Sequence, residues 1–110
     1  MKVFNRNKSS DPTPAEAALP HSTPINEVEP RIPVTIRGTI VRLKTIPRSG
    51  LPSLAVTIED ETGKVLAIWS GRRSIGGITL GRRLDLHGIA VAGQYELEFH
   101  NPEYTLRLPS

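Results

Sequence analysis

The side chains that could do chemistry in this chain are mainly arginines, and four of them form two adjacent pairs. Arg72–Arg73 and Arg82–Arg83 flank a connection at residues 71–81 that holds four glycines. A planar guanidinium donates two hydrogen bonds to phosphate oxygens, so the pairs could clamp a phosphate backbone. They could equally be charges that only keep a glycine-rich loop solvated. The segment lacks the Gly-Lys-Ser/Thr ending of a P-loop, so the sequence does not indicate ATP binding.

Other polar groups do not form a recognisable catalytic or metal site. Asp85 and His87 share one face of a predicted strand and could form an Asp–His pair, but no activated serine accompanies them and the chain has no cysteine. Glu59, Asp60 and Glu61 are adjacent, which is more typical of a solvated hairpin tip than of a hard-metal site. We therefore expect no enzymatic activity, no metal and no cofactor.

Length and composition restrict the class of protein. The 110 residues suit one domain. Without cysteine, a disulfide scaffold, a zinc finger and a thiol nucleophile are excluded. The sequence has no apolar run near the roughly 18 residues of a membrane span and no signal-peptide pattern at its start. These features predict a cytoplasmic protein.

Charge and proline divide the chain into two parts. Residues 1–30 carry a net charge of −1, residues 31–110 carry +4, and six prolines fall between Pro12 and Pro33. Because proline lacks a backbone donor, residues 1–30 are expected to form a flexible, disordered tail. A short helix is predicted at 14–19, where Thr13, Pro14 and Glu16 have capping-box spacing. The basic domain at 31–110 permits a nucleic-acid partner without requiring one.

Residues 31–110 show the alternation of β-strands. The apolar positions change from even to odd between Ile40 and Val41, which predicts a β-bulge or sharp bend near Gly38–Val41. Later strands are expected at 53–60, 64–70, 83–91 and 95–100, with 104–108 extending or flanking the last one. The connection at 71–81 is too glycine-rich for a good helix.

Five short strands without a covering helix favour a closed barrel, because closure removes exposed strand edges. The strand order, the bent first strand and the length predict an all-β, five-stranded Greek-key OB-fold barrel. An SH3-like barrel is the main structural alternative.

Five segments of the sequence carry a resemblance to a known family. They are V-T-I-R-G at 34–38, I-E-D-E-T-G at 58–63, L-A-I-W at 66–69, F-H-N-P-E-Y at 99–104 and the insert at 69–78. With these segments the chain is similar to OB-fold nucleic-acid-binding proteins over about residues 31–108. The resemblance is closest to the wedge domain of the branched-DNA helicase of bacterial recombination, and the insert resembles that of small stand-alone actinobacterial OB-fold proteins. The chain departs from the family in having a glycine-rich loop where a helix usually links strands three and four, and it carries no helicase motor.

The resemblance implies where a ligand would bind. OB folds bind oligonucleotides on strands two and three and on the loops after strands one and four. For Trp69 two interpretations stay open, base stacking or packing in the core. Because the chain has only five aromatic residues, binding should be weak and mostly electrostatic. The candidate nucleic-acid contacts are Arg42, Lys44, Arg48, Thr57, Lys64, Trp69, Arg72, Arg73, Arg82, Arg83, Gln94 and Tyr95.

The expected function is non-enzymatic, largely sequence-tolerant binding of single-stranded or branched nucleic acid. Single-stranded DNA is favoured over RNA, and DNA repair or recombination is the expected setting. The alternative is an OB-type protein-interaction module that acts as an accessory subunit, since one fold serves many functions.

Overall fold

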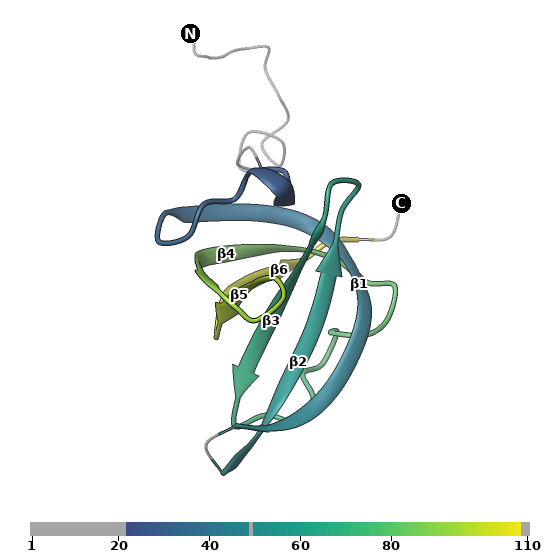
Figure 1. Cartoon of the computed structure of the whole chain (residues 1–110). Helices are drawn as coiled ribbons and strands as arrows, with labels where there is room; N and C mark the ends of the chain where they lie inside the picture. Colours follow the sequence, from purple (N-terminus) through teal and green to yellow (C-terminus); the bar gives the residue numbers. More distant parts are fainter. Residues whose placement is uncertain (1–21, 49, 109–110) are drawn as a thin grey trace, which may run out of the picture.

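The computed structural model describes residues 22–48 and 50–108, which form a twisted β-barrel (Figure 1). The predicted helix at 14–19 lies outside these residues. Within them, a short 3-10 helix precedes six strands, one more than the sequence predicted. The elements are η1 (Ile25–Glu27), β1 (Pro33–Arg48), β2 (Leu51–Glu59), β3 (Lys64–Ser70), β4 (Arg83–Ala92), β5 (Leu97–His100) and β6 (Glu103–Leu106).

The sheet closes because β1 is shared between two partners. The strand order is β1-β2-β3-β5-β4-β6, with an additional pairing between β1 and β4. The first half of β1, from Pro33 to Thr39, pairs with β4, and the second half, from Thr39 to Arg48, pairs with β2. The β3–β5 pairing is parallel and the others are antiparallel. This order confirms the predicted barrel. Closure of the barrel depends on one long bent strand, β1.

The bend in β1 falls where the change of phase predicted it. Ile40 pairs with Ile58 and Arg42 pairs with Thr57, so Val41 is an extra residue without a partner. One inserted residue reverses which face each later side chain occupies. The reversal lets Ile40 point into the core while Arg42, two positions on, points to solvent.

Gly38 permits β1 to pass close to β2 at this bend. A Cβ placed on Gly38 would lie 2.7 Å from the carbonyl oxygen of Glu59 and 2.7 Å from Cγ2 of Ile58. Both distances are shorter than real Cβ contacts, and one of the two atoms belongs to the backbone. A side chain at position 38 would therefore push the two strands apart.

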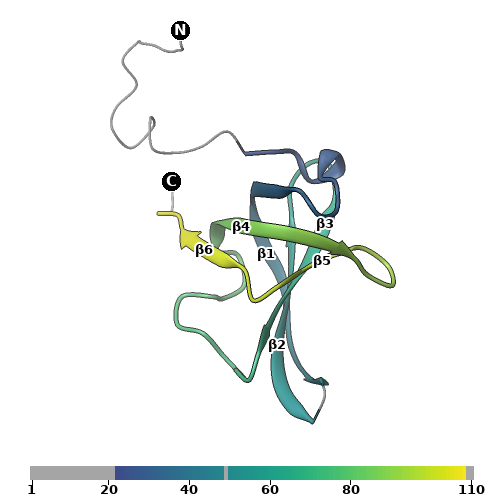
Figure 2. The ribbon, with the colours of Figure 1, turned by 90° about the vertical axis from the view of Figure 1, so that its left-hand side faces the viewer.

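The core is built from the inward faces of all the barrel strands. Its largest fully buried side chains include Phe99, Ile36 and Leu86. The connection at 71–81 forms no helix, as predicted, but it adds Ile75 and Ile78, which are 7% and 4% exposed. Figure 2 shows this connection leaving the end of β3 and returning to β4 on one side of the sheet. Its apolar side chains therefore close that side of the barrel.

Residues 22–30, which the sequence placed in the tail, contact the barrel. The side chain of Ile25 is only 5% exposed. Its backbone N–H donates to Oδ2 of Asp60 at 2.9 Å, and the N–H of Thr23 donates to the carbonyl of Thr35 at 2.8 Å. The packing of the domain therefore begins before residue 31, since one buried isoleucine and these hydrogen bonds hold the segment in place.

The C-terminal strands also differ from the prediction. β5 begins at Leu97 instead of Tyr95, and residues after Pro102 form a separate strand, β6, that pairs with β4. Asn101 has a φ of 52°, and its Oδ1 accepts the N–H of Ser70 at 2.9 Å. The indole N–H of Trp69 donates to the carbonyl of Pro102 at 3.1 Å. The N-P-E-Y stretch thus builds the corner between β5 and β6.

Candidate nucleic-acid interface

Three of the predicted contacts lie on one face of β1. Arg42, Lys44 and Arg48 are paired with Thr57, Ala55 and Leu51 of β2, and they alternate with the inward-facing Leu43. We call these three cations the β1 stripe. From Arg42 to Arg48 the stripe is about 20 Å long at the usual rise of a strand. Within residues 22–48 and 50–108, no acidic side chain forms an ion pair with any of the three.

The strand register places other side chains on the same surface. One row across the sheet runs from Arg42 through Thr57 and Leu66 to Glu98, and the next runs from Lys44 through Ala55 and Ile68 to His100. We call this surface the β2–β3 face. It is basic along β1 and carries the Glu98–His100 pair on β5. Over β2 and β3, Thr57 and Leu66 are half-buried, and Ala55 and Ile68 are buried. Thr57, a predicted contact, is therefore a neighbour of Arg42.

None of the described aromatic side chains is a member of these two rows. Trp69 points the other way and is 7% exposed, and its ring meets that of Tyr104 edge to face with centroids 5.7 Å apart. The core interpretation of Trp69 is confirmed and the base-stacking interpretation is wrong. The reason is the strand period of two: Trp69 pairs with Leu54, which also faces the core. Contacts on the β2–β3 face would thus depend mainly on charge.

The first arginine pair lies on the opposite side of the β1–β2 hairpin. Arg72 and Arg73 are exposed, and the carbonyl of Arg73 accepts the hydroxyl of Thr45 at 3.4 Å. Thr45 pairs with Leu54 on the inward side of β1, and Lys44 lies on the outward side. The loop therefore contacts the face of the hairpin opposite to the one that carries Lys44. Arg72 and Arg73 are therefore separated from the β1 stripe.

The remaining predicted contacts are separated from the stripe as well. Arg82 is half-buried beside the β1 bulge, where its carbonyl accepts the N–H of Ile40 at 2.9 Å. Arg83 pairs with Thr39 on another face of the barrel. Lys64 opens β3, which puts it about 20 Å from the hairpin end of that strand.

Gln94 and Tyr95 lie in the turn between β4 and β5. Tyr95 is 88% exposed, as expected for a residue beside a tight turn, and the amide of Gln94 donates to its hydroxyl at 3.3 Å. Because β5 runs parallel to β3, this turn lies at the Lys64 end of β3, away from the tip of the β1–β2 hairpin. The structure therefore gathers the β1 stripe and Thr57 and leaves the other candidates in separate groups.

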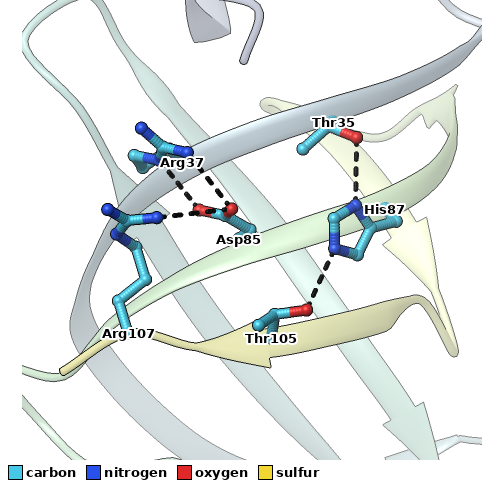
Figure 3. Close-up of polar contacts among 6 residues, drawn as sticks. All are labelled: Thr35, Arg37, Asp85, His87, Thr105 and Arg107. Atoms are coloured by element: carbon cyan, nitrogen blue, oxygen red, sulfur yellow. Dashed lines mark hydrogen bonds and ion pairs between the residues drawn. The ribbon is translucent and has the colours of Figure 1, made fainter. Parts of the chain in front are cut away.

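A second polar surface covers the outer side of β1, β4 and β6, and Figure 3 shows its centre. We call it the β4 face. Asp85 is buried, and its carboxylate accepts hydrogen bonds from Nε and Nη2 of Arg37 at 2.9 and 3.4 Å. Nη1 of Arg107 lies 3.6 Å from Oδ2 of the same carboxylate. The acid thus joins β4 to β1 and to the residue that follows β6. Sequence reasoning missed this cluster because its members are far apart in the chain.

His87 belongs to this β4 face and does not pair with Asp85. Its Nδ1 lies 3.0 Å from the hydroxyl of Thr35, and its Nε2 lies 3.2 Å from the hydroxyl of Thr105 (Figure 3). The possible Asp–His pair does not form, because each side chain bonds across to the neighbouring strands instead of along its own. The histidine links β1 and β6 through β4.

The D-E-T-G turn is held by the carboxylate of Asp60. Partial burial would raise the pKa of Asp60, but hydrogen bonds from the Thr62 hydroxyl and from the N–H groups of Ile25, Thr62 and Gly63 outweigh it and lower the pKa below 3.8. Oδ1 accepts the Thr62 hydroxyl at 2.6 Å and its N–H at 2.7 Å. Asp60 therefore has a structural role in joining η1 to the β2–β3 turn.

The described part of the chain contains no group of three or more His, Asp or Glu side chains placed to hold a metal ion. None of its helices has the length and apolar character needed to cross a bilayer.

Comparison with known proteins identifies the fold. No family model and no curated protein matches the sequence. Among solved structures, the chain is similar to the second OB-fold domain of replication protein A from Methanococcus maripaludis, determined by solution NMR, with a TM-score of 0.62 and 19% identity. The match covers 82% of this chain and 98% of that one. Together with the strand order β1-β2-β3-β5-β4 closed by β1, this similarity shows that the chain has the OB fold.

Proposed function

We propose that the protein binds single-stranded nucleic acid, without strong sequence preference and without catalysing a reaction, along the β1 stripe of the β2–β3 face. The observation that carries the proposal is the stripe itself, three cations in line with no acidic partner among the described residues. A line of cations without acidic partners suits a phosphodiester backbone, and OB folds commonly bind single strands on this face.

A branched substrate fits the placement of the second group of cations. Arg72 and Arg73 lie on the other side of the β1–β2 hairpin from Lys44, so the hairpin could separate two strands that each meet a basic surface. The sequence resemblance to a wedge domain supports the same substrate, and with it a place in DNA repair or recombination. The structural neighbour belongs to a protein named for replication, which supports DNA over RNA.

The test is a fluorescence-anisotropy titration with labelled single-stranded DNA and RNA over a series of salt concentrations. For three neutralised phosphates on a single strand, log K should fall with log salt with a slope of about −2. Arg42→Gln should weaken binding to all sequences alike and make the slope less steep by about 0.7.

Arg31→Gln is the matched control, because Arg31 is exposed and lies away from the stripe beside Ala90 of β4. It should leave the slope unchanged. Absence of binding at low salt, or binding that salt does not weaken, would contradict the proposal.

A protein-interaction module is the second candidate function. It is favoured by apolar side chains exposed near the start of β1 and the end of β4: Ile32 is 52% exposed, Ile89 50% and Val91 40%. A flat titration with DNA and RNA, combined with capture of a protein that survives nuclease treatment, would favour this candidate.

A further inference from the structure

A hollow of about 380 Å³ lies at the corner between β5 and β6. These two strands follow one another along the same edge of β4, with β5 pairing from Ala90 onward and β6 pairing up to His87. Gly88 and Ile89 lie between these two paired segments of β4 and pair with neither β5 nor β6. The hollow opens at this gap, and its size falls within the range of roughly 300–1,000 Å³ that is usual for small-molecule sites.

The lining of the hollow suits a flat ring and not a phosphate. Pro33 and Ile89 contribute exposed apolar surface, and the buried side chains of Pro102 and Phe99 belong to the same lining. The lining contains no lysine or arginine, while Glu103 is part of it. An anion would therefore meet no cation here and would be repelled by Glu103.

Two polar side chains at the rim still have unused hydrogen-bonding groups. The ring of His100 is 45% exposed, and its Nε2 lies 2.9 Å from Oε1 of Glu98. Its Nδ1 has no partner among the described residues. Oδ1 of Asn101 accepts the N–H of Ser70, which leaves the amide N–H groups of Asn101 free to donate. A ring edge that carries both donors and acceptors could bind here.

The hollow continues the surface on which the backbone would lie. His100 is the last member of the row that begins with Lys44 and crosses Ala55 and Ile68. Three strand spacings separate the ends of this row, about 14 Å. The roughly 4–16 nucleotides that an OB fold covers are enough to cross it and reach the hollow.

We propose that the hollow between β5 and β6 is a nucleobase pocket, which receives one unstacked base from the strand bound to the β1 stripe. This inference rests on the proposed function. The pocket replaces the aromatic platform that the β2–β3 face lacks: the base packs on Ile89 and Pro33, while His100 and Asn101 bind its edge.

The test separates base contacts from phosphate contacts. The uniformly ¹⁵N-labelled full chain is titrated with a ten-nucleotide thymidine strand, and separately with a ten-unit abasic strand of the same charge, while backbone amide signals are followed by NMR. The amides of Ile89, His100 and Asn101 should shift only with the thymidine strand. Those of Arg42 and Lys44 should shift with both strands.

Affinities of variants supply a second readout. Ile89→Ala should weaken binding to the thymidine strand by roughly fivefold or more, the lower part of the range for one stacked base, and leave binding to the abasic strand unchanged. Since Ile89 is half exposed, this change should not unfold the barrel. Leu80→Ala is the matched control, because Leu80 is 65% exposed in the 71–81 connection and should affect neither strand.

The outcomes distinguish the two proposals. If the stripe amides shift and the pocket amides stay still, or shift equally with the abasic strand, the nucleobase pocket is wrong and the proposed function stands. If neither strand shifts the stripe amides, both proposals fail.

Discussion

The same strand carries arginines in two contrasting settings. Arg37 and Arg42 both project from the outer surface of β1, one on each side of the bulge. The guanidinium of Arg37 is bound to the buried carboxylate of Asp85, whereas Arg42 faces Thr57 and has no acidic partner among the described residues. The two arginines show that a basic side chain on a barrel surface is available to a ligand only where it forms no ion pair with a buried acid.

The difference follows from the cost of burying a charge. Asp85 is 1% exposed, and an ionised carboxylate in that position requires partners for its oxygens. Arg37 and Arg107 supply these partners, so both cations of the β4 face are paired within the protein. The β2–β3 face buries no acid beside β1, and its cations keep their charge for solvent or a ligand.

The largest expected effect separates the two arginines directly. Arg37→Met should lower the free energy of unfolding by about 2–3 kcal/mol, because it leaves the buried Asp85 with only the longer contact to Arg107. Arg42→Met, a matched change on the same strand, should alter it by no more than about 0.5 kcal/mol. Urea denaturation measures both values. Equal losses of unfolding free energy in the two variants would contradict the distinction between the paired Arg37 and the unpaired Arg42.

The second prediction concerns Gly38, at the bend of β1 between the β4 face and the β2–β3 face. Gly38→Ala should destabilise the fold by about 2 kcal/mol, since the new methyl group would overlap the backbone of Glu59 and β1 would have to shift. Gly76→Ala is the control, because a Cβ there has nothing within 4 Å. Thermal unfolding of both variants checks this, and a neutral Gly38→Ala would mean that β1 can bend without the close approach.

The corner between β5 and β6 should respond to backbone conformation more than to lost contacts. Asn101→Ala should cost about 1–2 kcal/mol, because alanine is disfavoured at a φ of 52° and cannot accept the N–H of Ser70. Asn101→Gly keeps the conformation available and should cost less. Chemical denaturation of the two variants measures the difference, and a larger loss for glycine would show that the conformation at 101 is not the main contribution.

The smallest effect is the pH dependence of the Asp60 turn. The pKa of Asp60 is lower in the folded state, so its contribution to stability is fully present above the unfolded value of about 3.9. That contribution is lost as the pH falls through the folded pKa. Unfolding measured between about pH 5 and pH 2.5 should therefore show a weaker acid dependence for Asp60→Asn than for the unaltered chain. Identical slopes would assign the acid sensitivity to other groups.

Much of the fold could be predicted because strands leave a local signal. Alternation of apolar residues placed the strands, and one change of phase located the bulge at Val41. The same alternation does not show that residues after Pro102 form a separate strand on β4. Four residues are too short a run to distinguish from an extension of β5, and only the turn at Asn101 separates them.

The candidate site was harder to predict because it depends on neighbours across the sheet. The alternation at 41–44 put Arg42 and Lys44 on one face, and the structure agrees. Arg48 was expected in the loop after the first strand, and it joins them because β1 continues to Arg48. The path of the 71–81 connection could not be read in the same way. The sequence did contain a signal in Ile75 and Ile78, because two apolar residues three positions apart indicate a loop that packs against the core. This packing places Arg72–Arg73 on the side of the hairpin opposite to the stripe.

The division of β1 between two partners also determines the order of events during synthesis. Arg37 and Asp85 are 48 positions apart, so the first half of β1 has no strand to pair with until β4 has left the ribosome. Up to that point the nascent chain can form only the β1–β2–β3 meander, with the inward side chains of β1 exposed. Closure of the barrel is therefore a late, long-range event, and contacts of that kind fold slowly.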